Sequence, residues 1–180
     1  MARVDKIIQA QTYPDIEHIY LWGEGTIGDK RNRACQQAKG EIILHIDSDD
    51  LYSADWVEKQ VNLLQDTGSD ICGLSEIYFL SETEAWRYRW SNATPWVAGA
   101  TLCYRKAFWE THPFRDIQVA EDYYFLDGAK VVAGDYTDRF IATLHEDNTA
   151  PHRKSTNWHK MPHSEIMTKT NQTLSFLACL

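Results

Sequence analysis

Residues 41–46, with the sequence EIILHI, constrain the fold of this chain more than any other stretch. A near-continuous run of β-branched and apolar side chains of this length is typical of a strand that is buried on both faces. Helical and strand-like patterns alternate around it, and such alternation predicts helices layered on a sheet. The 180 residues are enough for one domain with a sizeable core. We therefore expect an α/β fold with a central, mostly parallel sheet flanked by helices.

Apolar periodicity and cap residues predict the individual elements. Helices are expected at residues 3–11 and 29–39, and a third from an N-cap at Ser53 to a C-cap at Gly68. Strands are expected at residues 16–22, 41–46, 70–80, 85–90 and 97–104.

Three aspartates, Asp47, Asp49 and Asp50, come directly after the central strand. Open α/β sheets bind ligands at the carboxyl ends of their strands. Carboxylates crowded at such a place are costly unless a cation neutralises them, and Mg²⁺ or Mn²⁺ prefers oxygen ligands and keeps positions free for phosphates. The cluster therefore predicts a divalent-cation site. The alternative is a solvated loop in which the aspartates form turns and cap a helix.

Composition narrows the class of protein. The chain has 18 Lys and Arg against 26 Asp and Glu, a net charge of −8, and no basic block, which argues against a broad nucleic-acid surface. The start, MARVDKII, lacks the apolar core of a signal peptide, and no apolar run approaches the ~18 residues of a membrane span. The four cysteines have no metal-ligand spacing and are expected to be buried, reduced thiols. These features predict a cytoplasmic protein.

The motifs around the aspartates resemble those of glycosyltransferase family two. The run GDKRNRACQQAKGEIILHIDSDD is similar to its N-x-x-x-x-x-A-x-G-E-x-(apolar)-x-D-x-D-D segment. Downstream, WVAGATLCYRKAFWETHPF and VAEDYYF resemble the family's Gly-rich acceptor-side strand with its aromatic helix, and its Glu-Asp motif. The resemblance covers about residues 9–153. It implies a GT-A fold at residues 1–150, followed by a tail at residues 151–180 that packs on the domain or acts as a lid.

The resemblance also implies roles for the acidic residues. Asp47 matches an aspartate near the ribose of the sugar nucleotide, and Asp49 matches the ligand of the cation that bridges the diphosphate. Asp122, in the pair Glu121-Asp122, matches the catalytic base. The alternative for that pair is a set of acids favoured at the start of a helix by its macrodipole.

Other matched residues complete the predicted site. Arg31, with Lys30 beside it, matches a basic residue that approaches the nucleotide, and the alternative is an exposed helix face. His145 is placed like a histidine that joins Asp49 and Asp47 at the metal, or it is a structural residue at a strand end. The acceptor side is expected to include Trp96, Gly99, Trp109 and Glu121. For the tryptophans, core packing and sugar stacking both stay open.

These roles predict an inverting, metal-dependent glycosyltransferase. A carboxylate takes the proton from an acceptor hydroxyl of a carbohydrate or other molecule, and Mn²⁺ or Mg²⁺ stabilises the departing diphosphate of a nucleotide sugar, expected to be a UDP-sugar. The alternative is a catalytically impaired glycan- or protein-binding module on a shortened scaffold.

The chain departs from the family at its beginning. The first strand and a Pro-Thr-Tyr-Asn-like turn have no counterpart, and LWGEGTIGDKRN stands where the family has an acidic Val-Asp-Asp-Gly-Ser-like stretch. Glu24 is a candidate replacement for one missing acid. Residues 16–22 then take the place of the missing strand, or the sheet is rearranged, or a partner chain completes it, which leaves a homo-oligomer open. Peripheral membrane contact of the tail also stays open.

Overall fold

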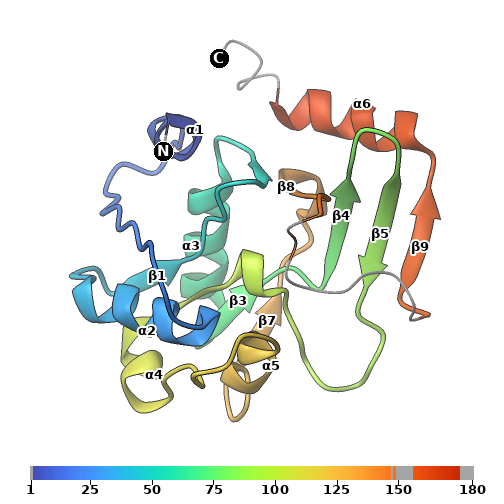
Figure 1. The fold of residues 1–180 in the computed structure, drawn as a ribbon. Helices are drawn as coiled ribbons and strands as arrows, with labels where there is room; N and C mark the ends of the chain where they lie inside the picture. Colours follow the sequence, from blue (N-terminus) through green and yellow to red (C-terminus); the bar gives the residue numbers. More distant parts are fainter. Residues whose placement is uncertain (1, 147, 149–155, 175–180) are drawn as a thin grey trace.

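The computed structural model describes residues 2–146, 148 and 156–174 (Figure 1). The helices are α1 (Ala2–Gln9), α2 (Ile27–Gln37), α3 (Trp56–Thr67), α4 (Lys106–Thr111), α5 (Glu121–Phe125) and α6 (His163–Leu174), with single 3₁₀ turns at η1 (Gly99–Thr101) and η2 (Thr137–Arg139). The strands are β1 (Ile42–Leu44), β2 (Leu51–Tyr52), β3 (Ile71–Gly73), β4 (Glu76–Leu80), β5 (Ala85–Arg89), β6 (Cys103–Arg105), β7 (Val131–Ala133), β8 (Phe140–Thr143) and β9 (Trp158–Met161).

The strands form two sheets, with the orders β1-β6-β3-β7 and β2-β8-β4-β5-β9. In Figure 1 the sheets lie side by side, with α2, α4 and α5 near the first and α6 across one end of the second. The α/β class is as expected, but the strand directions are not mostly parallel. Within the described residues, only β3–β7 and β4–β8 are parallel among seven pairings. The connection between β4 and β5 shows one cause of the antiparallel pairings. It is a short turn, and a short turn can join only antiparallel neighbours.

Three of the expected strands differ from the structure. Residues 16–22 are extended but belong to no strand of the described chain. The expected strand at residues 70–80 is divided into β3 and β4, because the chain passes from one sheet to the other at Leu74. There the Leu74 amide donates to the hydroxyl of Thr101 at 2.9 Å instead of to a strand. The expected strand at residues 97–104 shortens to β6, preceded by η1.

The central run also differs from its expected burial. β1 is half-buried, not buried on both faces, because β6 is its only described partner and its other edge borders a cavity. The helix that follows ends as predicted, with Gly68 in the left-handed conformation (φ 56°). Its N-cap is Asp55, not Ser53, because the Ser53 hydroxyl is engaged with the Asp55 carboxylate at 2.7 Å.

The core holds the site-bearing segments in place. Tyr52, Trp56 and Phe140 are almost fully buried, and their rings lie 5.1 to 5.6 Å apart, which fixes β2, α3 and β8 against one another. Of the predicted tail, residues 156–174 form β9, which pairs with β5, and α6, whose buried Ile166 packs on the second sheet. Residues 151–155 and 175–180 lie outside the described residues.

Candidate active site

The loop after β1 brings an aspartate and a histidine together. β2, just past the loop, pairs with β8, and β8 ends two residues before His145. His145 Nε2 therefore lies 2.6 Å from Oδ2 of Asp49, although 96 positions separate them. The amide of Asn148 also contacts Nε2 at 3.1 Å. The side chains are 35% and 42% exposed, so the pair is open to a ligand from solvent.

Asp50 anchors the same loop. Its side chain is buried, and its Oδ1 accepts the Thr143 amide at 2.8 Å. Burial, with Asp47 nearby, raises the pKa of Asp50 to about 8, so its carboxyl group is largely protonated at neutral pH. Asp50 therefore ties the loop to β8 and is poorly suited to hold a cation.

Asp47 begins the same loop and lines the cavity beside β1. Its amide donates to the Tyr52 hydroxyl at 2.9 Å. Burial by the surrounding protein raises the pKa of Asp47 above its ordinary value, and the Arg31 guanidinium offsets only part of that shift. In the described ranges no group of three His, Cys, Asp or Glu residues is gathered as a metal site, so Asp47 does not join the Asp49–His145 pair in one.

A second acidic position lies on α5. Asp122 Oδ2 accepts the Gly99 amide at 3.1 Å, and Oδ1 accepts the Tyr123 amide at 2.8 Å. Its neighbour Glu121 is buried and forms an ion pair with Arg31 of α2. Burial raises the pKa of Glu121 while Arg31 lowers it. Glu121 therefore fixes Arg31 in place, and Asp122 is the acid that stays half-exposed.

Backbone strain marks the residue before these acids. Ala120 has a φ of 66° and is the only non-glycine residue with positive φ among the described residues. Such a conformation costs of order 1 kcal/mol or more and tends to persist where the surroundings demand it. Here it turns the chain into α5 directly before Glu121.

His45 supports Gly99 from the other side, and sequence reasoning missed it. Its Nδ1 lies 3.0 Å from the Gly99 carbonyl oxygen, and its Nε2 lies 3.1 Å from the Tyr104 hydroxyl. Burial, and then Arg31, lowers the pKa of His45 to about 3, so the ring is neutral. Because a carbonyl only accepts, we assign the proton to Nδ1. The available signal was a polar residue inside the otherwise apolar run EIILHI.

The two tryptophans predicted on the acceptor side, Trp96 and Trp109, lie in different environments. Trp96 is half-buried, stacks on Trp90 at 5.1 Å and meets Tyr88 edge-on at 5.4 Å. Burial chiefly raises the pKa of Tyr88, a hydrogen bond with Asn157 lowers it, and the Asp122 charge raises it further. Trp109 is instead only 8% exposed and donates from Nε1 to Asn32 at 2.9 Å. Trp109 therefore packs in the core and not on an open surface.

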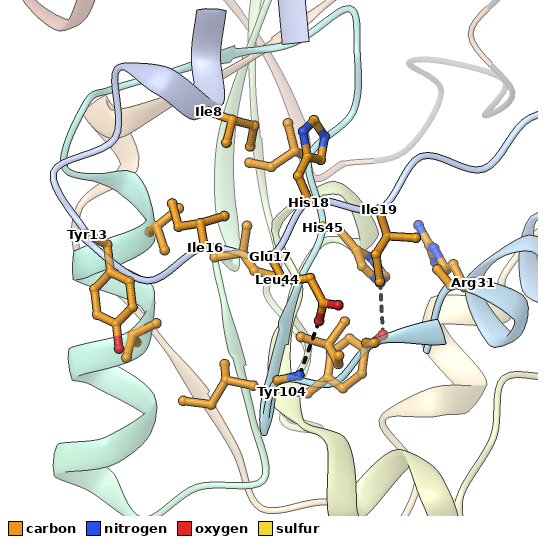
Figure 2. Close-up of a pocket in the computed structure, with 18 of the residues that line it drawn as sticks. Ile8, Tyr13, Ile16, Glu17, His18, Ile19, Arg31, Leu44, His45 and Tyr104 are labelled. Atoms are coloured by element: carbon orange, nitrogen blue, oxygen red, sulfur yellow. Dashed lines mark hydrogen bonds between the residues drawn. The ribbon is translucent and has the colours of Figure 1, made fainter. Parts of the chain in front are cut away.

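One cavity adjoins the site. It measures about 370 Å³ and lies between residues 13–21 and β1 (Figure 2). Lys30, Arg31, His45 and Asp47 line part of it, so the basic residues of α2 and the first aspartate face the same space. Glu24 does not line it.

The fold and these residues define a glycosyltransferase-type α/β domain. The chain belongs to glycosyl transferase family 2, whose sequence profile matches residues 3–124. The crystal structure of S. aureus TarS 1-349 in complex with UDP-GlcNAc has a similar fold, with a TM-score of 0.50 and 20% identity over 69% of this chain and 41% of that chain. The complex of TarS 1-349 with UDP aligns at a TM-score of 0.48 and 20% identity, over 67% of this chain and 40% of that chain.

The structural match covers only part of each chain. This chain spans about two fifths of the length of TarS 1-349. No curated protein sequence matches it significantly. Across the described ranges, no helix is both long and apolar enough to cross a membrane.

Proposed function

We propose that this domain transfers a sugar from a nucleotide-sugar donor, a UDP-sugar, to an acceptor hydroxyl with inversion of configuration. The observation that carries the proposal is the pair of acidic positions on separate segments, with Asp49 against His145 and Asp122 held by Gly99. Arg31 pairs with Glu121, the neighbour of Asp122, and lines the same cavity as Asp47.

Asp122 is the proposed base. The acceptor oxygen attacks the anomeric carbon while its proton passes to the Asp122 carboxylate. The bond between the anomeric carbon and the diphosphate oxygen breaks, and the nucleoside diphosphate leaves. A single displacement of this kind inverts the anomeric centre. The amides of Gly99 and Tyr123, which donate to the two oxygens of Asp122, hold its carboxylate in one orientation.

The donor end is proposed to hold Mn²⁺ or Mg²⁺. The partly exposed carboxylate of Asp49 and imidazole of His145 supply one oxygen and one nitrogen and leave room for diphosphate oxygens and water, which fits such an ion. When bound, the cation would stabilise charge on the leaving diphosphate. Asp47, Lys30 and Arg31 are proposed to contact the nucleotide beside it, from the wall of the cavity.

The acceptor is proposed to rest on the aromatic group beside Asp122. The stacked pair Trp90–Trp96 and the neighbouring Tyr88 offer the flat apolar surface on which a sugar ring stacks. The same group is compatible with the competing function, a non-catalytic glycan-binding module. That function predicts binding of a carbohydrate without any nucleotide and with Asp122 dispensable.

Turnover of UDP-sugars in the presence of Mn²⁺ tests the proposal. Asp122→Asn is expected to lower turnover by about 10²–10⁴-fold while UDP still binds, because only the proton acceptor is lost. Asp127→Asn is the matched control, since Asp127 is an exposed acid just beyond α5. Unchanged turnover in Asp122→Asn contradicts the assignment of Asp122 as the base. Glycan binding by the wild type without any turnover contradicts the proposed transferase.

A further inference from the structure

A chain of hydrogen bonds leads from α2 to the proposed base on α5. It begins at Cys35, whose Sγ lies 3.1 Å from the Tyr104 hydroxyl oxygen. That oxygen lies 3.1 Å from Nε2 of His45, a contact that Figure 2 draws as a dashed line. Nδ1 of His45 lies 3.0 Å from the Gly99 carbonyl oxygen, and the Gly99 amide donates to Oδ2 of Asp122 at 3.1 Å. The chain therefore connects α2, β6, η1 and α5.

Only one direction of donation fits all of these contacts. A carbonyl oxygen can only accept, so the proton of the neutral His45 ring lies on Nδ1, and Nε2 is an acceptor. The Tyr104 hydroxyl then donates to Nε2, and its oxygen accepts from the Cys35 thiol. In the opposite direction the ring proton would lie on Nε2, and the bare Nδ1 would face the Gly99 carbonyl oxygen, where two acceptors repel each other.

Packing holds the Tyr104 ring independently of its hydroxyl. Tyr104 is fully buried, and Phe125 of α5 meets its ring edge-on, with 4.8 Å between the ring centroids. Phe114 also meets it edge-on, at 5.9 Å. Tyr104→Phe therefore removes the hydroxyl and keeps the packed ring, so a change in this variant reports the loss of the hydrogen bonds.

We propose that Tyr104 is a positioning residue for sugar transfer, because its hydroxyl keeps the His45 proton on Nδ1 and so holds Gly99 against Asp122. The proposal rests on the transferase function, in which Asp122 accepts the proton of the acceptor hydroxyl. The carbonyl and the amide of Gly99 belong to neighbouring peptide groups, so the chain acts through the position of Gly99 and carries no proton to Asp122. Its effect is expected on the chemical step and not on donor binding.

The state of the His45 ring can be measured without any turnover. Nitrogen NMR distinguishes protonated from unprotonated ring nitrogens, and His45→Gln identifies the His45 signals among the seven histidines. We expect the proton on Nδ1 in the wild type. In Tyr104→Phe we expect the Nε2 signal to move, because its donor is lost, and the Gly99 amide hydrogen to exchange roughly threefold to tenfold faster. A wild-type proton on Nε2, or an unchanged exchange rate of Gly99 in Tyr104→Phe, overturns the proposal.

Turnover of a UDP-sugar separates positioning from a general loss of stability. Tyr104→Phe is expected to lower kcat roughly threefold to tenfold with KM for the donor unchanged. Tyr136→Phe is the matched control with kcat unchanged, since it removes a tyrosine hydroxyl that donates to Gln60 at 3.2 Å, outside the chain. Equal losses of kcat in the two variants, or a rise in KM alone in Tyr104→Phe, overturn the proposal.

The outcomes also separate this proposal from the transferase function on which it rests. A wild-type protein without turnover contradicts the transferase and this proposal with it. An active wild type with unchanged kcat in Tyr104→Phe contradicts this proposal alone.

Discussion

The Gly99 amide donates to Oδ2 of Asp122 over 3.1 Å, and this contact joins η1 to α5 across 23 positions of the chain. A β-carbon at Gly99 would lie 2.8 Å from that oxygen and 3.2 Å from Nη2 of Arg31. A glycine is therefore required here by the close approach of the two side chains.

Gly99→Ala is expected to displace the Asp122 carboxylate and to reduce turnover by roughly tenfold to a hundredfold, since small displacements of a catalytic group are costly. Turnover of a UDP-sugar measures the effect. Gly40→Ala is the control, because its β-carbon would meet only the Ile42 carbonyl oxygen at 3.7 Å, an ordinary contact. Similar losses in both variants would contradict the assigned role of Gly99.

The free energy of unfolding should depend on pH through the lowered pKa of His45. Its pKa is about 3 in the folded protein and near 6.5 in the unfolded chain, so the unfolded state binds the extra proton between these values. Its contribution to stability is complete above pH 6.5 and is lost as the pH falls toward 3, by up to about 1.4 kcal/mol per pH unit. Denaturant unfolding of metal-free protein across this range measures it, with His45→Gln as the reference that cannot titrate.

Turnover measurements test whether the His45 ring also positions Gly99, apart from its effect on stability. Glutamine can still donate to the Gly99 carbonyl, whereas leucine cannot. We expect His45→Gln to keep most turnover and His45→Leu to lower kcat with little change in KM, because Gly99 positions Asp122 and not the donor. Equal kcat values in the two variants would count against this positioning.

The Arg31–Glu121 ion pair should show strong coupling. Its side chains are 15% and 7% exposed, so removing one partner leaves a poorly solvated charge. Arg31→Met and Glu121→Gln are each expected to cost about 3 kcal/mol of unfolding free energy, and the double variant less than their sum. A double-mutant cycle from chemical denaturation measures the coupling. If the two effects on the unfolding free energy were additive, the interaction between Arg31 and Glu121 would contribute little to stability.

Metal-dependent nucleotide binding should depend on Asp49 and His145. Calorimetry with UDP is expected to show tighter binding when Mn²⁺ is present, and Asp49→Ala should abolish that gain. His145→Ala should reduce it in part, because the charged ligand, the Asp49 carboxylate, remains. Asp66→Ala, at an exposed acid of α3, serves as the control. If the wild-type protein binds UDP with the same affinity with and without Mn²⁺, the proposed cation site is rejected.

Local signals in the sequence were sufficient for part of this fold. The periodicity of residues 56–67 and the glycine after them define α3 and its end, because helix propensity and a left-handed cap act within a few residues. The ordered motifs around Asp47–Asp49 and Asp122 led to the family, and the match over residues 3–124 confirms it. The roles of those residues stay predictions.

Pairing between distant segments was decided only by the tertiary structure. Residues 16–22 have the composition of a strand but form none, because a strand needs a neighbour at hydrogen-bonding distance and the cavity separates them from β1. Trp109 could not be assigned to core or surface from its neighbours in sequence, and its contact with Asn32 settles it as buried. His45 became visible as a support of Gly99 only when β1 and η1 were brought together.

By itself, the sequence determined the residue types at the site: aspartates after an apolar run, an acidic pair downstream, and a histidine after another apolar run. The tertiary structure decided which of them meet. Asp49 reaches His145 through the β2–β8 pairing, and Glu121 takes Arg31 and leaves Asp122 half-exposed. The physical reason is that such contacts depend on register and packing across 90 or more positions, which no local preference encodes.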